Sequence, residues 1–87
     1  MITDKSGAAA VADVEAWAGS IVRNSDQSME TAVYHDADSS TYVIRLAKGT
    51  RVLLFRLSEG QVQSPQREGE CEKIMKARIK EISAKLM

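Results

Sequence analysis

The sequence predicts an α+β fold with the element order α-β-β-β-β-α, in which a four-stranded antiparallel meander carries two helices packed on one face, as a two-layer sandwich. Apolar residues recur at helical spacing near the N-terminus, alternate with polar residues in the middle, and return to helical spacing after residue 64. A chain of 87 residues has room for one hydrophobic core, so residues 1–87 are expected to form a single domain.

The first helix is expected over residues 7–23, because its apolar positions fall on one side of a helix and polar residues fall between them. These apolar positions are Val11, Val14, Ala18, Ile21 and Val22, with Trp17 beside them. Thr3, Asp4 or Ser6 can cap the start, and the polar run of residues 24–28 ends the helix.

Four strands are expected between residues 31 and 64, where the period falls to two and β-branched and aromatic residues are enriched. A five-residue turn at residues 36–40 and two-residue turns at residues 48–49 and 59–60 would connect them. This register gives one face of the sheet to the core. The residues on that face are Ala32, Tyr34, Tyr42, Ile44, Leu46, Leu53, Phe55, Leu57 and Val62.

The second helix is expected over residues 65–87, with Ser64 as its cap and Pro65 at its first position. Gly69 weakens the first turn by about 1 kcal/mol relative to alanine, so the regular helix is expected to begin near Glu70. Its apolar stripe consists of Cys71, Ile74, Met75, Ile79, Ile82 and Leu86. The last turns of so long a helix would overhang the sheet and could pair with another helix, although packing on its own sheet is the commoner use of such a stripe.

The charge of the chain is segregated although it sums to zero. Residues 1–40 hold two basic and seven acidic side chains, whereas residues 41–87 hold ten basic and five acidic ones. The single cysteine, Cys71, cannot form an internal disulfide, which favours a cytoplasmic protein. No apolar stretch reaches the roughly 20 residues of a membrane span, so no membrane partner is expected.

The only histidine, His35, lies in a His-Asp-Ala-Asp run at the first turn. One hairpin offers too few converging ligands for a metal, and aspartates and serines at this position are typical turn formers, so we expect no metal site. The run also begins like a calcium loop, but Thr41 stands where that loop needs glycine.

Other catalytic patterns are weaker still. Cys71 lies on an apolar stripe beside glutamates, which is typical of a buried structural thiol. The five glycines are scattered and form neither a phosphate loop nor a dinucleotide fingerprint, so no cofactor is expected. We therefore expect no enzyme, and keep a small enzyme or ligand-binding domain with a site near His35 as one alternative.

Nucleic-acid binding is a second alternative. In its order of a helix, a three-strand meander and a helix, most of the chain resembles a double-stranded-RNA-binding domain. That family binds phosphates through a lysine cluster at the start of its last helix, where this chain has Arg67 followed by Glu68, Glu70 and Glu72. Carboxylates there would repel a phosphate backbone, so nucleic acid is an unlikely partner, and RNA binding would depend on Arg67 and Lys73.

The predicted outer face of the sheet is more apolar than a solvated face should be. Its expected partner-binding residues are Val33, Val43, Arg45, Val52, Leu54 and Arg56. Either one helix crosses to this side and buries the row, or the face is a contact surface with an apolar centre and an arginine rim. We favour the contact surface and expect a non-enzymatic protein-protein interaction or regulatory module, which acts as a homodimer or binds another protein.

Overall fold

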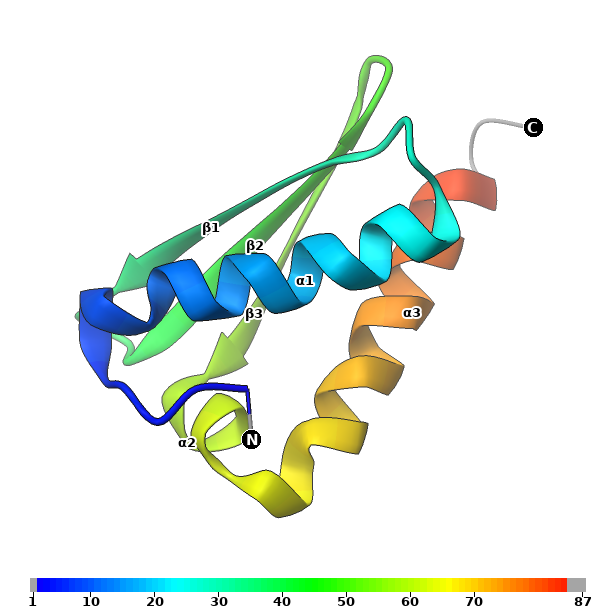
Figure 1. The fold of residues 1–87 in the computed structure, drawn as a ribbon. Coiled ribbons are helices and arrows are strands. Elements are labelled where there is room, and N and C mark those ends of the chain that lie inside the picture. The colour runs from blue at the N-terminus through cyan, green and yellow to red at the C-terminus, as the bar shows by residue number, and fades with distance from the viewer. Residues whose placement is uncertain (1, 85–87) are drawn as a thin grey trace.

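The computed structural model describes residues 2–84 and is an α+β domain with a three-stranded antiparallel sheet (Figure 1). Its elements in chain order are η1 (Gly7–Ala10), α1 (Val11–Ser25), β1 (Glu30–Asp36), β2 (Thr41–Lys48), β3 (Arg51–Ser58), α2 (Glu59–Gln63), η2 (Pro65–Arg67) and α3 (Glu68–Ala84). Two of these are single turns of 3₁₀ helix.

The sheet has the order β1-β2-β3, so β1 and β3 are its edges. The predicted fourth strand is not confirmed, because the residues after β3 form the short helix α2 instead. A capping box starts that helix: the Ser58 hydroxyl accepts the N–H of Gln61, and the Gln61 side chain accepts the N–H of Ser58. Two helical donors are thereby satisfied where a hairpin turn was expected.

The core lies between the sheet and the two long helices, which cover the same side of the sheet (Figure 1). Helix α1 contacts β1, and α3 contacts β2 and β3. The fully buried large side chains come from every layer: Tyr42, Ile44, Leu46, Leu57, Met75, Ile82, Val14, Val22, Val62 and Cys71. The predicted core faces of both long helices are therefore confirmed for the described residues.

The β2–β3 hairpin keeps the predicted faces but not the predicted pairs. Gly49 and Thr50 form its turn, one residue later than expected, and Gly49 adopts a φ of +61° that favours glycine. Ile44 therefore pairs with Phe55 rather than Leu53. A shift of two residues preserves the side of the sheet on which each side chain lies.

The β1–β2 hairpin corrects the predicted register by one residue. Its turn contains residues 37–40 rather than 36–40, so Val33 pairs with Ile44 and Tyr34 pairs with Val43. A slip of one residue exchanges the two faces of a strand. Val33 therefore lies in the core with an exposed fraction of 5%, and the prediction that it lies on the outer face was wrong. Ala32 and Tyr34, predicted for the core, lie on the outer face.

Helix α3 begins at Glu68, two residues before the position expected from Gly69. It buries Cys71, Met75, Ile79 and Ile82, as its stripe predicts. The predicted continuation to residue 87, with the overhang of Leu86, lies outside the described residues. Among residues 2–84, no helix combines the length and the hydrophobicity that crossing a membrane requires.

Candidate functional site

The candidate site is the face of the sheet that points away from both helices. Strand alternation and the observed register place four rows of side chains on this face. The rows are Asp36, Thr41 and Ser58; Tyr34, Val43 and Arg56; Ala32, Arg45 and Leu54; and Glu30, Ala47 and Val52. No element of residues 2–84 covers these rows, which excludes for this part of the chain the arrangement in which a helix crosses to this side.

The large exposed hydrophobic side chains of the described residues all lie on this face. Tyr34 is 54% exposed, Val52 is 52% exposed and Leu54 is 60% exposed. Val43 lies half-buried between Tyr34 and Arg56. Scattered single hydrophobic residues are normal on a protein surface, but a contiguous group rimmed by charge is typical of an interaction site. We call Tyr34, Val43, Val52 and Leu54 the apolar patch.

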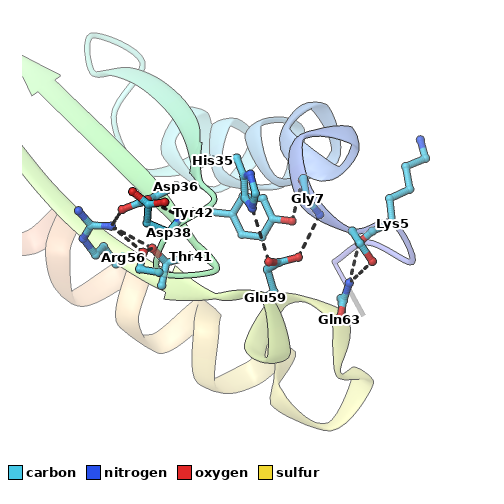
Figure 2. A network of polar contacts seen from close by, with 12 residues as sticks. Lys5, Gly7, His35, Asp36, Asp38, Thr41, Tyr42, Arg56, Glu59 and Gln63 are labelled. Atoms are coloured by element: carbon cyan, nitrogen blue, oxygen red, sulfur yellow. Dashed lines mark hydrogen bonds and ion pairs between the residues drawn. The ribbon is translucent and has the colours of Figure 1, made fainter.

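A polar cluster at one end of the face fixes Arg56 beside the patch (Figure 2). One guanidinium nitrogen of Arg56 donates to Asp36 Oδ2 at 2.8 Å and to Thr41 Oγ1 at 2.9 Å. The same nitrogen lies 3.3 Å from the Ser39 hydroxyl. The Arg56 hydrogen bond, followed by that of Ser39, lowers the pKa of Asp36 below its ordinary value. The Asp36 carboxylate is thus kept in its charged form, and it holds the Arg56 guanidinium at the edge of the apolar patch.

Five of the six predicted partner-binding residues lie on this face: Val43, Arg45, Val52, Leu54 and Arg56. Val33 does not, because of the one-residue slip in β1. Tyr34 takes its place and was missed for the same reason. A four-residue turn between Asp36 and Thr41, in place of the expected five-residue turn, would have placed Tyr34 on this face.

His35 belongs to a different cluster, at the end of the sheet near the N-terminal segment (Figure 2). Its Nε2 lies 3.5 Å from Oε2 of Glu59, and its ring stacks at a tilt on Tyr42 with centroids 5.2 Å apart. Glu59 Oε1 accepts the N–H of Gly7 at 3.0 Å, and the Tyr42 hydroxyl donates to the Gly7 carbonyl at 2.9 Å. Burial, with the nearby Glu59 charge, raises the pKa of Tyr42.

The contacts of this cluster form a clamp between separate parts of the chain. Both oxygens of Glu59 and the hydroxyl of Tyr42 hold other parts of the chain. The His35 ring contacts Glu59 and Tyr42, and Glu59 also forms a hydrogen bond with the Ser40 side chain. The described residues also contain no group of three His, Cys, Asp or Glu side chains that could hold a metal ion.

Cys71 is buried in the core and donates weakly to the Gln61 carbonyl at 3.6 Å. Burial raises the pKa of its thiol, and the neighbouring Glu70 adds to the effect. A thiol with a raised pKa is a poor nucleophile. The sequence-based reading of a structural cysteine fits this position.

The start of α3 has the charge arrangement that the sequence indicates. The guanidinium of Arg67 donates to both oxygens of Glu70, at 3.2 and 3.1 Å. Gln61 donates to the same carboxylate at 2.9 Å. The arginine and the amide hydrogen bonds lower the pKa of Glu70, which keeps a negative charge at this end of the helix.

Comparison with known proteins does not assign this chain to a family. No family model, curated protein or solved structure matches this chain.

Proposed function

We propose that this chain is a non-enzymatic, cytoplasmic protein-binding module that pairs with a second copy of itself through the outer face of its sheet. The observation that carries the proposal is that Tyr34, Val52 and Leu54 gather on one open face and are each more than half exposed. Burying such a patch is the main source of free energy in protein association. The arginines at its rim supply orientation.

The charge of the face favours a second copy as the occupant. Strand β1 carries Glu30 and Asp36, whereas β2 and β3 carry Arg45 and Arg56. A two-fold axis parallel to the strands would lay β1 of one copy over β3 of the other, so the acidic side of each copy would meet the basic side of its partner. The complementarity is confined to the two sides of the face, because β2 lies at the axis and Arg45 of each copy would face Arg45 of the other.

The same arrangement pairs particular side chains. Tyr34 would lie over Arg56 of the second copy, where a guanidinium can stack on the aromatic ring. Leu54 would lie against Ala32 of the second copy, so that a large side chain meets a small one. Each contact occurs twice because the interface is symmetric.

The decisive experiment measures mass in solution by sedimentation for the wild-type chain and for Leu54→Asp. The wild-type chain should give a mass of about twice 9.5 kDa at high concentration, and the variant should give a folded monomer with an unchanged circular dichroism spectrum. Ala77→Asp, on the exposed side of α3, is the matched control and should still dimerise. A wild-type chain that stays monomeric at millimolar concentration contradicts the proposal, as does an equal loss in both variants.

RNA binding is the second candidate, because the three-stranded sheet gives the chain the helix, three-strand, helix order of double-stranded-RNA-binding domains. Affinity for an RNA duplex should then fall steeply with salt and should depend on Arg67 and Lys73. The Arg67–Glu70 pair weakens this candidate, since it neutralises the arginine that would contact phosphate. If the protein is not retained on immobilised duplex RNA at low salt, the RNA-binding candidate is excluded.

A further inference from the structure

The free edge of β1 is covered by a side chain rather than by a strand. The backbone N–H of Val33 donates to Oε2 of Glu15, which lies on α1, at 3.2 Å. Among residues 2–84, β1 pairs only with β2. Because alternate residues of a strand direct their backbone groups to the same side, Thr31, Val33 and His35 all direct their N–H and C=O groups toward this free edge.

A groove of about 370 Å³ runs along the same edge, between β1 and α1. Its lining residues are Ala12, Glu15, Ala16, Gly19, Val22, Arg23, Met29 and Thr31. The Thr31 hydroxyl is the one buried side-chain polar atom of the described residues that has no hydrogen-bond partner. Since its oxygen is buried although Thr31 lines the groove, this atom lies just beneath the groove surface.

We propose that this edge takes an extended peptide from another protein, which adds to β1 as an antiparallel strand and places alternate side chains in the groove. Backbone hydrogen bonds to Thr31, Val33 and His35 would give the affinity. The peptide would displace Glu15 from the Val33 N–H, and a peptide carbonyl would replace the carboxylate as its acceptor. This site is separate from the outer face and does not depend on the proposed dimer.

Two charged residues in the groove, Glu15 and Arg23, indicate which charges the peptide should carry. Helix α1 runs opposite to β1 (Figure 1), so an antiparallel peptide runs from Glu15 toward Arg23. These residues are eight positions apart, or about 12 Å along a helix, which corresponds to about four residues of a strand. A basic residue should therefore precede an acidic residue by four positions. Because Glu15 reaches the Val33 N–H, the basic residue would lie opposite Val33 and the acidic residue opposite Met29, which also lines the groove.

A second copy is a poorer occupant of this edge. In an antiparallel β1–β1 pair centred on Val33, Glu30 of each copy would lie opposite Asp36 of the other. The two Glu15 carboxylates, each bonded near the centre of its own strand, would also approach one another. Like charges directly opposite one another destabilise a strand pair.

The test is a binding titration with the fluorescein-labelled peptide Ser-Lys-Thr-Val-Thr-Glu-Ser. Its Lys, Val and Glu face the groove, with Lys opposite Val33 and Val opposite Thr31. The charge-swapped peptide Ser-Glu-Thr-Val-Thr-Lys-Ser should bind about three- to fivefold more weakly, as two partly exposed ion pairs would give. Methylation of the backbone nitrogen of the peptide Val should weaken binding about tenfold, because it removes a hydrogen bond to β1.

Variants of the protein locate the site. Ala16→Phe fills the groove and should abolish binding, whereas Asn24→Phe, also exposed on α1 but outside the groove, should not. Leu54→Asp should leave peptide binding unchanged, which separates this proposal from the outer-face dimer. In the complex, the Val33 amide should show a large NMR shift and slower hydrogen exchange.

Three outcomes would overturn the proposal. One is the absence of any NMR shift with either peptide at 1 mM, a concentration at which even an affinity of about −4 kcal/mol is detectable. The second is equal binding of the methylated and unmethylated peptides, which would mean that no strand is added. The third is a Leu54→Asp dimer that competes with the peptide, which would assign the edge to a second copy.

Discussion

Glu59 accepts the backbone N–H of Gly7 at 3.0 Å, a contact that joins residues 52 positions apart in the chain. The other oxygen of the same carboxylate lies 3.5 Å from His35. The segment before α1 is attached further along α2, where the N–H groups of Ile2 and Thr3 donate to the Val62 carbonyl. The N-terminal segment is therefore held by α2 as well as by the sheet.

The first prediction concerns the pH dependence of this contact. The Gly7 N–H, followed by His35, lowers the pKa of Glu59 below its ordinary value of 4.5. A lowered pKa in the folded state stabilises the fold above the unfolded pKa, and this stability is lost as the pH falls through the folded pKa. Glu59→Gln should therefore lower the melting temperature at pH 7, and its difference from wild type should shrink below about pH 4.5.

Thermal unfolding followed by circular dichroism between pH 2 and 7 measures this effect. Asp38→Asn, at an exposed carboxylate in the turn between β1 and β2, serves as the control and should change the melting temperature little. A Glu59→Gln difference that is the same at every pH would contradict the assignment.

A second pH effect is predicted for the loop between α1 and β1. Asp26 forms an ion pair with Lys48 at the end of β2 and accepts hydrogen bonds from Ser28. Lys48, followed by Ser28, lowers the pKa of Asp26 from 3.8 to about 2. Its stabilising effect is therefore present above pH 3.8 and is lost as the pH falls toward 2.

Asp26→Asn should destabilise the protein at neutral pH, and urea unfolding should show the difference from wild type vanishing only near pH 2. Lys48→Met should reproduce part of the loss, and the double variant should be less destabilised than the sum of the two single variants. Strict additivity would show that the two side chains do not interact in solution.

A third prediction tests the faces of β3. Leu57→Ala empties a fully buried site and should lower the free energy of unfolding by about 2–5 kcal/mol. Leu54→Ala, on the same strand but on the open face, should change it by no more than about 0.5 kcal/mol at concentrations at which the chain is monomeric. Urea denaturation measures both. Comparable losses in the two variants would mean that the outer face is covered in the monomer.

The residues explain which parts of this fold can be predicted from the sequence. The faces of β2 and β3 follow from alternation alone, and Tyr42 and Leu57 stay in the core although their turn lies one residue later than expected. The face of β1 depends instead on the length of a polar turn. Asp36 accepts the N–H of Asp38 there, and Ser40 takes a φ of +53°, but several turn lengths suit such residues.

The prediction of a fourth strand was not confirmed for a different reason. Glu59 and Gly60 are typical of a tight turn, but Ser58 and Gln61 have the spacing of a capping box, which stabilises a helix at the same place. The candidate site was predictable to the extent that it lies on β2 and β3, so Leu54 was found. Tyr34 was missed because the predicted turn before β2 was one residue too long, which assigned the side chains of β1 to the wrong faces. The edge groove was not predictable, since it depends on how α1 packs beside β1.

A fourth prediction compares two glycines. Gly7 has a φ of +59°, which alanine adopts at a cost of about 1–2 kcal/mol. A Cβ added there would lie 3.8 Å from His35, an ordinary contact, so the cost comes from the backbone alone. Gly69 lies in α3 with open space around it, where alanine should stabilise the helix by up to about 1 kcal/mol.

Gly7→Ala should therefore lower the free energy of unfolding by about 1 kcal/mol after the reduced entropy of the unfolded chain is included. Gly69→Ala should raise it, and the double variant should lie near wild type because the two glycines share no neighbouring side chain. Urea denaturation measures these changes in the free energy of unfolding. A stabilising Gly7→Ala would mean that the first turn adopts another conformation in solution, and the clamp on Glu59 would then be absent as well.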